Sequence, residues 1–244
     1  MTAPSITISG LSVDFAGSEG LFDDLALTID AGVTTCILGP SGCGKSTLLK
    51  LLSGSTEYRS SGSIIFEPAD SHTVAWMGQD DFLLPWLSLV DNVMLGARLR
   101  GEVDDSVRDK AADLITRAGL AGYEKALPSA LSGGMRQRGA LLRTLMEDRP
   151  VLLMDEPFSA LDALTRIKLQ DISAEMTRGK TTLLVTHDTM EALRLGHRII
   201  ILGSEPARVV SRLEFSSPPP REPDNPEVVQ HYGPLLKQLL REEW

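Results

Sequence analysis

The fold of this chain is decided by the stretch Gly39-Pro40-Ser41-Gly42-Cys43-Gly44-Lys45-Ser46-Thr47. Within it, Gly39, Gly44, Lys45 and Ser46 satisfy the phosphate-loop pattern G-x-x-x-x-G-K-S/T. Glycines allow successive backbone N–H groups to converge on phosphate oxygens, and a helix that opens at Lys45 adds its positive dipole end. The stretch therefore predicts a binding site for a nucleoside triphosphate.

The residues on either side of this loop support the prediction. Residues 33–38 form a short β-rich run and residues 48–52 have the composition of a helix, so the loop has strand–loop–helix context that a chance glycine turn lacks. We expect Lys45 to reach the β- and γ-phosphates and Ser46 to bind Mg²⁺ through its hydroxyl. Thr47, one residue further into the helix, is placed to bond an α-phosphate oxygen.

Length and composition restrict the class of protein. The 244 residues suffice for one large α/β domain, and a net charge of −9 argues against nucleic acid as a partner. The apolar runs are strand-length, well short of the ~20 residues of a membrane-spanning helix, and the N-terminal residues do not resemble a signal peptide. We therefore expect a cytoplasmic location. Cys36 and Cys43 are expected to be free thiols, since a disulfide or metal pair would not suit a strand and a phosphate loop.

The pattern of apolar residues predicts an α/β protein with three kinds of region. An N-terminal antiparallel β-region is indicated by alternation at Ile6, Ile8, Leu11, Val13 and Phe15, followed by Leu25, Leu27 and Ile29. Residues 151–155 and 181–186 are continuous apolar runs typical of buried parallel strands. Between them, residues 82–150 change to helical periodicity, for example at Val107, Ala111, Leu114, Ile115 and Ala118.

We expect one domain over residues 1–244, comprising a nucleotide-binding core of residues 1–81 and 151–210, an inserted helical subdomain of residues 82–150 and a C-terminal extension of residues 211–244. In the extension, the proline-rich residues 216–226 favour an extended, exposed connector that wraps the surface. Residues 228–240 predict a short amphipathic helix with a candidate break at Gly233-Pro234. Packing on the parent domain is favoured over binding to a partner.

Polar side chains at the ends of the buried strands are the candidate catalytic residues. Asp155 and Glu156 follow the first strand, which gives one carboxylate to hold Mg²⁺ and one to act as a base on an attacking water. His187 follows the second strand, where an imidazole can bond the γ-phosphate. Gln79 carries an amide that can coordinate Mg²⁺ or orient water. Each of these residues alone would more often be structural or a solvated surface group, and only the set favours catalysis.

A second phosphate-binding element is indicated by Leu131-Ser-Gly-Gly-Met-Arg-Gln137, because Ser132, Gly133 and Gly134 precede a helix and can present a hydroxyl and backbone N–H groups. A single site does not need two such elements. We therefore expect two chains to meet head to tail, with the Ser132 loop of each completing the site built around the other chain's Lys45.

The ordered set of these motifs resembles that of an ABC transporter ATP-binding subunit over about residues 5–210. The set comprises residues 39–47, Gln79, 131–137, 152–156, the segment Ser159-Ala-Leu-Asp162, and His187. The resemblance implies a P-loop NTPase (RecA-like) core that uses ATP and Mg²⁺. It further implies a signature loop that acts in trans, a Ser-Ala-Leu-Asp segment that signals across the dimer, and an aromatic residue, here Phe15, that stacks on adenine. Core packing is the alternative for Phe15.

The segment after Gln79 narrows the resemblance. Leu83-Leu-Pro-Trp86, followed by Asp91-Asn-Val93, is similar to the nitrate, sulfonate and taurine importer group, which includes uptake systems for pyrimidine precursors of thiamine. The resemblance implies membrane permeases as partners, with Phe82, Leu83, Leu84 and Trp86 at the interface, and an extracytoplasmic solute-binding protein acting indirectly. It places the chain peripherally, at the cytoplasmic face of the membrane.

The solute does not follow from the residues, although residues 134–149 and 186–197 resemble the pyrimidine-precursor subunits more than the others. The alternative function is a soluble ABC ATPase that drives protein assembly or cell-division signalling. A monomeric P-loop kinase or GTPase leaves residues 131–137 unexplained. One residue departs from the family pattern: Gly139 stands where the family usually has an apolar side chain, and a glycine costs a helix about 1 kcal/mol relative to alanine.

Overall fold

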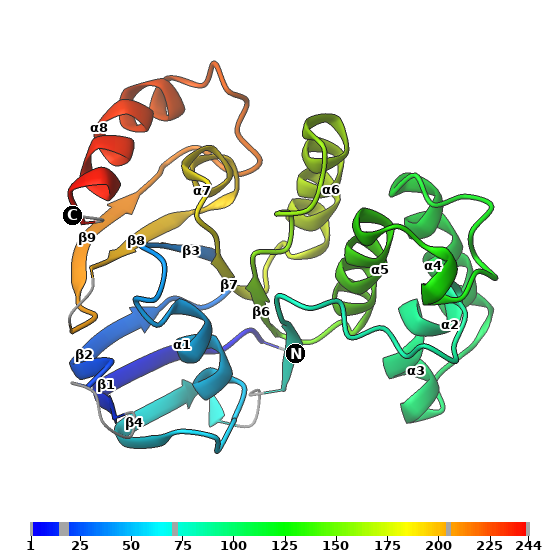
Figure 1. Ribbon diagram of the computed structural model, residues 1–244, viewed down its shortest axis with the longest axis horizontal. Helices are drawn as coiled ribbons and strands as arrows, with labels where there is room; N and C mark the ends of the chain where they lie inside the picture. Colours follow the sequence, from blue (N-terminus) through cyan, green and yellow to red (C-terminus); the bar gives the residue numbers. More distant parts are fainter. Residues whose placement is uncertain (1, 15–19, 70–72, 204–205, 243–244) are drawn as a thin grey trace. The chain divides into compact units, whose positions relative to one another are not determined.

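The computed structural model describes residues 2–14, 20–69, 73–203 and 206–242 (Figure 1). They divide into two compact units, and each is described by itself. The first unit contains residues 1–74, 150–155 and 177–244, and the second contains residues 75–149 and 156–176. The expected division into core, helical subdomain 82–150 and extension 211–244 stays a prediction; in the structure, residues 156–176 group with the helices.

The first unit contains an antiparallel sheet near its N-terminus. Its strands lie in the order β2-β1-β4, where β1 is Ser5–Asp14, β2 is Phe22–Ile29 and β4 is Arg59–Glu67. Ile6 stands opposite Ile29 on one side and Phe66 on the other. The alternating apolar residues of β1 and β2 are buried, as expected of a half-buried antiparallel sheet. The predicted antiparallel β-region is therefore confirmed.

A parallel sheet forms the centre of the same unit. Neighbouring strands are β6 (Val151–Asp155), β7 (Thr181–Val185), β3 (Thr34–Leu38) and β8 (Arg198–Leu202), and β9 (Val209–Glu214) adds antiparallel to β8. Every residue of β3, β6 and β7 is buried, which explains why these strands appear in the sequence as continuous apolar runs. The two predicted parallel strands are confirmed, with the second ending at Val185.

Helices cover this sheet. Helix α1 (Lys45–Leu52) contacts β6 and β7, while α7 (Thr189–Leu195) contacts β3 and the C-terminal helix α8 (Pro226–Glu242). The predicted break at Gly233-Pro234 does not occur, because α8 runs through Pro234. Packing of this helix on its own unit is confirmed, since Val228 and Leu235 are buried.

The proline-rich connector before α8 differs from the expectation of an exposed strap. Its Arg221 is among the largest fully buried side chains of the described residues. Guanidinium nitrogen Nη1 of Arg221 donates to the carbonyl oxygens of Leu193 (2.9 Å) and Gly196 (2.7 Å), and the backbone N–H of Arg221 donates to the Arg194 carbonyl (2.9 Å). The connector therefore caps the C-terminal end of α7, where a positive charge is also favoured by the helix dipole.

The second unit is mostly helical. It contains β5 (Val74–Met77), which begins at the boundary, and the helices α2 (Leu89–Val93), α3 (Leu95–Arg100), α4 (Asp105–Arg117), α5 (Gly133–Met146) and α6 (Ala163–Met176). Helix α5 packs against α2, α3, α4 and α6. The helical periodicity predicted for residues 107–118 is confirmed by α4, whose Ala111, Leu114 and Ile115 are buried. Among the described residues, no helix is both long and apolar enough to cross a membrane.

Candidate nucleotide-binding site

The phosphate loop links β3 to α1, as its sequence predicts. Gly44 forms the N-cap of α1 with φ 94°, a left-handed conformation that glycine adopts without strain. A Cβ at Gly44 would also lie 2.8 Å from the Phe22 ring, and one at Gly39 would lie 2.4 Å from the carbonyl oxygen of Leu202. Both glycines are therefore required by space, and Gly44 by conformation as well.

Lys45 directs its ammonium group into this loop. Its Nζ donates to the carbonyl oxygens of Gly39 (2.8 Å) and Pro40 (2.7 Å), and the residue is 8% exposed. Two hydrogen bonds from a charged donor stabilise the loop from within and satisfy a buried cation. Ser41 and Gly42 form the exposed tip of the loop.

The parallel register brings other candidate residues to the same edge of the sheet. Asp155, the last residue of β6, stands opposite Val185 of β7, and Val185 in turn stands opposite Ile37 of β3. Asp155 is buried, while His187, two residues beyond β7, is exposed. The carboxylate, the imidazole and the phosphate loop thus follow neighbouring strands at their carboxyl ends, where ligands of open α/β sheets bind.

The donor set at this edge fits Mg²⁺. Ser46 and Thr47 are half-buried in the first turn of α1, and Ser46 and Asp155 offer a hydroxyl and a carboxylate. Magnesium takes hard oxygen ligands and commonly uses one or two protein groups together with phosphate oxygens. The described residues contain no cluster of three or more His, Cys, Asp or Glu side chains that could hold a metal alone.

Both cysteines are free and buried, as expected. Burial raises the pKa of the Cys43 thiol, and the charge of Lys45 opposes that shift. Burial also raises the pKa of the Cys36 thiol. Neither thiol is therefore activated as a nucleophile, which agrees with the space-filling role predicted for them.

In the second unit, Ser132 forms the N-cap of α5. Its Oγ accepts a hydrogen bond from the backbone N–H of Met135 (3.3 Å), and Gly133 and Gly134 open the first turn. Ser132 and Gly133 are exposed. An exposed hydroxyl and backbone N–H groups at the start of a 14-residue helix are suited to binding an anion.

Glu156 also belongs to the second unit and has an unusual backbone. Its φ is 50°, in the left-handed region that is unfavourable for residues other than glycine. The side chain of Gln137 in α5 holds the turn that follows: its Nε2 donates to the Glu156 carbonyl (3.2 Å), and its Oε1 accepts from the Ala160 N–H (2.9 Å). Strained backbone of this kind persists only where the surroundings fix it.

Gln79 is exposed, and the segment after it is held by polar side chains of α5 and α2. Arg136 Nε donates to Asp81 Oδ2 (2.9 Å), and Arg143 donates to the carbonyl oxygens of Asp81 (2.9 Å) and Phe82 (2.6 Å). The fully buried Asn92 bonds both the N–H (2.7 Å) and the carbonyl oxygen (3.2 Å) of Leu84.

The structure also gives the reason for Gly139. A Cβ at this position would lie 2.8 Å from Leu89 Cδ1, so the glycine admits α2 and its buried leucine close to α5. The cost in helix propensity is offset by this close packing.

The structure thus brings residues 39–47, Asp155 and His187 to one sheet edge of the first unit, while Gln79, residues 132–134 and Glu156 belong to the second. Phe15 lies outside the described residues. Gln137, Arg136 and Arg143 support the candidate residues, and no individual role for them is predicted from the sequence. The available signal for Gln137 and Arg136 was a glutamine between two arginines, Arg136 and Arg138, at the start of a helix.

A family model described as "ABC transporter" matches residues 22–159, more than half of the chain. The chain belongs to the ABC transporter family. The chain binds ATP and is an ATPase of this family.

Curated relatives of this ABC protein cover most of its length. An uncharacterized ABC transporter ATP-binding protein of Haemophilus influenzae is 47% identical over 82% of this chain and 82% of the relative. An aliphatic sulfonates import ATP-binding protein of Delftia acidovorans is 41% identical over 97% of this chain and 95% of the relative. An aliphatic sulfonates import ATP-binding protein of Burkholderia cenocepacia is 37% identical over 98% of this chain and 89% of the relative.

Solved ABC cassettes share its fold. The dimeric post-hydrolysis state of the cassette MJ0796, bound to ADP and Pi, superposes with a TM-score of 0.74 at 27% identity, covering 87% of this chain and 99% of that one. An ATP-binding subunit of an ABC transporter superposes with a TM-score of 0.77 at 24% identity over 98% of both chains, which supports the fold alone. The predicted α/β P-loop NTPase class is confirmed.

Proposed function

We propose that this chain is the ATP-hydrolysing subunit of an importer, in which ATP-driven closure of two cassettes moves separate membrane permeases. The observation that supports this most directly is that relatives 37–41% identical over more than nine-tenths of the chain are import ATP-binding proteins. The alternative, a soluble ABC ATPase for assembly or cell division, has no support from those names.

Within this proposal, the residues of the sheet edge bind the nucleotide. Lys45, now bonded to carbonyls of its own loop, donates to the β- and γ-phosphates, and residues 39–47 surround the phosphates with N–H groups. Ser46 and Asp155 hold Mg²⁺, with Gln79 as a further ligand. The ion neutralises charge on the phosphates when bound. Phe15 stacks on the adenine.

Hydrolysis is assigned to three side chains. Glu156 accepts a proton from the attacking water, and Gln79 orients that water. His187 bonds the γ-phosphate. General-base catalysis contributes about 10²–10⁴-fold, so Glu156 is the residue whose loss has the largest expected effect on turnover.

A second copy of the chain completes each site. Ser132, Gly133 and Gly134 of one chain bind the γ-phosphate of the ATP held by the other, which accounts for two phosphate-binding elements in one chain. The solved structures of the cassette MJ0796 are dimeric. The segment Ser159–Asp162 carries the signal across that dimer.

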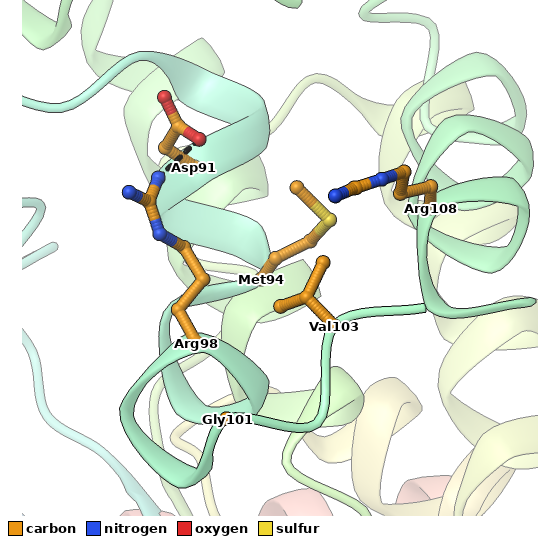
Figure 2. A pocket seen from close by; sticks show the side chains of 6 residues that line it. All are labelled: Asp91, Met94, Arg98, Gly101, Val103 and Arg108. Carbon is orange, nitrogen blue, oxygen red and sulfur yellow. Dashed lines mark hydrogen bonds and ion pairs between the residues drawn. The ribbon is translucent and has the colours of Figure 1, made fainter. Parts of the chain in front are cut away.

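The permeases are proposed to contact the second unit. Phe82 and Trp86 are exposed there, by 53% and 71%, although their neighbours are firmly held by Arg143 and Asn92. The same unit has a hollow of about 480 Å³ lined by Asp91, Met94, Arg98, Gly101, Val103 and Arg108. In Figure 2, Arg98 pairs with Asp91, while Arg108 points across the hollow to Met94. Exposed aromatic side chains and a concave surface in the same unit suit a protein–protein contact.

The solute is handled by the permeases and by an extracytoplasmic solute-binding protein, and the chain acts peripherally at the cytoplasmic face of the membrane. The relatives' names make aliphatic sulfonates the first class to test. A pyrimidine precursor of thiamine stays a prediction without support from these names.

The proposal is tested by co-expressing the tagged chain with its candidate permease pair and purifying it in detergent. We expect the permeases to co-purify and to stimulate ATP hydrolysis, with ATP preferred over GTP. A Phe82→Ser/Trp86→Ser double variant should lose the permeases while keeping ATP binding. Retention of a soluble scaffold or division protein in place of the permeases would support the alternative function instead.

A further inference from the structure

The turn that carries the proposed catalytic base has an unfavourable backbone conformation at Glu156. Glu156 has φ 50°, and its carbonyl oxygen accepts from the N–H (3.3 Å) and the Oγ (3.1 Å) of Ser159 inside the turn. A glutamate in the left-handed region gains nothing from that conformation itself. The free energy that holds it there has to come from contacts with the rest of the unit.

Gln137 supplies those contacts with every polar atom of its side-chain amide. Nε2 donates to the Glu156 carbonyl (3.2 Å) and to Ser159 Oγ (3.1 Å), and Oε1 accepts from the Ala160 N–H (2.9 Å). The opposite orientation of the amide would place Oε1 against the Glu156 carbonyl and Nε2 against an N–H group, so only one orientation satisfies the turn. Gln137 is 8% exposed, which makes the loss of any of these three hydrogen bonds costly.

The start of α5 lies against the same turn. A Cβ at Gly134 would approach the Ala160 carbonyl oxygen to 3.2 Å. The first turn of α5 therefore lies close to the end of the turn formed by residues 156–160. Gln137 follows Ser132–Gly134 by one helical turn. Residues 132–137 and 156–160 therefore form one connected structure within the second unit.

We propose that Gln137 is a positioning residue for hydrolysis: its amide fixes the backbone of Glu156 and so aims the catalytic carboxylate. The inference rests on the function proposed above, in which Glu156 acts on one ATP while Ser132–Gly134 of the same chain bind the ATP of the partner. Gln137 then connects, within one chain, the base of one site to the closing loop of the other. A change at either end is passed to the other through three hydrogen bonds.

The test compares Gln137→Met with wild type in steady-state ATP hydrolysis and in solution mass with and without Mg-ATP. Methionine keeps the length and helix propensity of the side chain and removes its hydrogen bonds. We expect kcat to fall tenfold or more while KM for ATP changes less than twofold. Because nucleotide binding is spared and hydrolysis is slow, the variant should also accumulate an ATP-dependent dimer that wild type does not.

A matched control removes another buried polar group from the same helix. Thr144 is 3% exposed and its Oγ1 bonds only within α5, to the Ala140 carbonyl (3.1 Å). Thr144→Val should leave kcat and the dimer unchanged. Gln137→Glu, which keeps the acceptor for Ala160 and loses the donors, should reproduce the kcat loss if the methionine variant does not fold.

The kcat of Glu156→Gln distinguishes an error in the role proposed for Gln137 from an error in the role proposed for Glu156. If Glu156→Gln abolishes hydrolysis while both Gln137 variants keep wild-type kcat, the inference is overturned and the proposed function stands. A fall in kcat together with a raised KM and loss of the ATP-dependent dimer would also overturn it, because Gln137 would then only stabilise the fold. If Glu156→Gln keeps wild-type kcat, the assignment of the base itself is wrong.

Discussion

The phosphate loop and the turn of residues 156–160, which carries the proposed base Glu156, differ in the contacts that hold them in place. Lys45 bonds carbonyls five and six residues before it, and Gly44 adopts its left-handed φ without strain because it is a glycine. Glu156 adopts a similar φ without being glycine and depends on Gln137, nineteen residues earlier in the chain. The proposed ATP-binding loop is thus held by polar bonds within itself, whereas the turn of the proposed base Glu156 is held by a side chain from a distant helix. A sequence motif therefore identifies the whole phosphate loop. For the turn it identifies Glu156 but not the role of Gln137, which holds Glu156 in place.

The largest expected effect on stability comes from a third region, the C-terminal extension, whose Arg221 bonds carbonyl oxygens at the end of α7 more than twenty residues earlier in the chain. Arg221→Met removes the cap on α7 and leaves the carbonyl oxygens of Leu193 and Gly196 without their donor. We expect the free energy of unfolding to fall by about 3 kcal/mol, as for loss of a buried, hydrogen-bonded charge. Urea unfolding measures it, with the exposed Arg212→Met on β9 as the matched control. Equal stability of the two variants would show that the extension is not clamped.

The next effect tests the local element. Lys45→Met should weaken ATP binding by about 10- to 100-fold, as for loss of hydrogen bonds to a charged group, because the phosphates lose their ammonium partner. Binding of a fluorescent ATP analogue measures this affinity. Lys50→Met, which changes a half-buried lysine at the other end of the same helix, should bind ATP as wild type does. Equal affinity of the two variants would contradict the role of Lys45 in the site.

A smaller effect is expected where α2 and α5 meet. Gly139→Val introduces side-chain carbons where a Cβ alone would approach Leu89 Cδ1 to 2.8 Å, so overpacking should destabilise the protein by about 1–3 kcal/mol. Thermal unfolding followed by circular dichroism checks the change. A variant more stable than wild type would mean that helix propensity outweighs packing at this position.

The smallest expected effect is a pH dependence of stability that arises from His197, next to the end of α7 that Arg221 caps. Burial and then the charge of Arg221 hold the pKa of His197 below its ordinary 6.5, and His197 Nδ1 accepts from the Thr34 N–H (3.0 Å). The unfolded chain therefore binds the proton of His197 more readily than the folded chain does. The stabilisation that the neutral His197 provides is fully present above pH 6.5 and declines as the pH falls below 6.5. Urea unfolding at pH 7.5 and 5.5 should show a smaller decline in His197→Asn. An identical decline in both proteins would rule out this linkage.

The sequence predicts those parts of the molecule that depend on neighbours in the chain. The alternating residues of β1 and β2 and the apolar runs of β6 and β7 follow from the pleat and from burial, and the phosphate loop follows from its glycines. Residues whose roles depend on distant partners were not predictable in this way. Arg221, in a proline-rich connector, has the composition of a solvated strap and is instead buried.

Gly139 illustrates the same limit within a helix. On propensity alone it weakens α5, and its purpose becomes clear only with Leu89 placed against it. Gln137 is similar, because a glutamine in a helix is ordinarily a surface residue and its amide has meaning only beside the turn of residues 156–160. In each case tertiary contacts, which no local pattern encodes, decide the role of the residue.

In the proposed function, two chains enclose ATP between the phosphate loop of one and the Ser132 loop of the other. The most direct test is the solution mass of Glu156→Gln with and without saturating Mg-ATP. We expect the mass of one chain without nucleotide and the mass of two chains with Mg-ATP. Adding Ser132→Arg should return the mass in Mg-ATP to that of one chain. A single-chain mass at saturating Mg-ATP, or a dimer that survives Ser132→Arg, would contradict this arrangement.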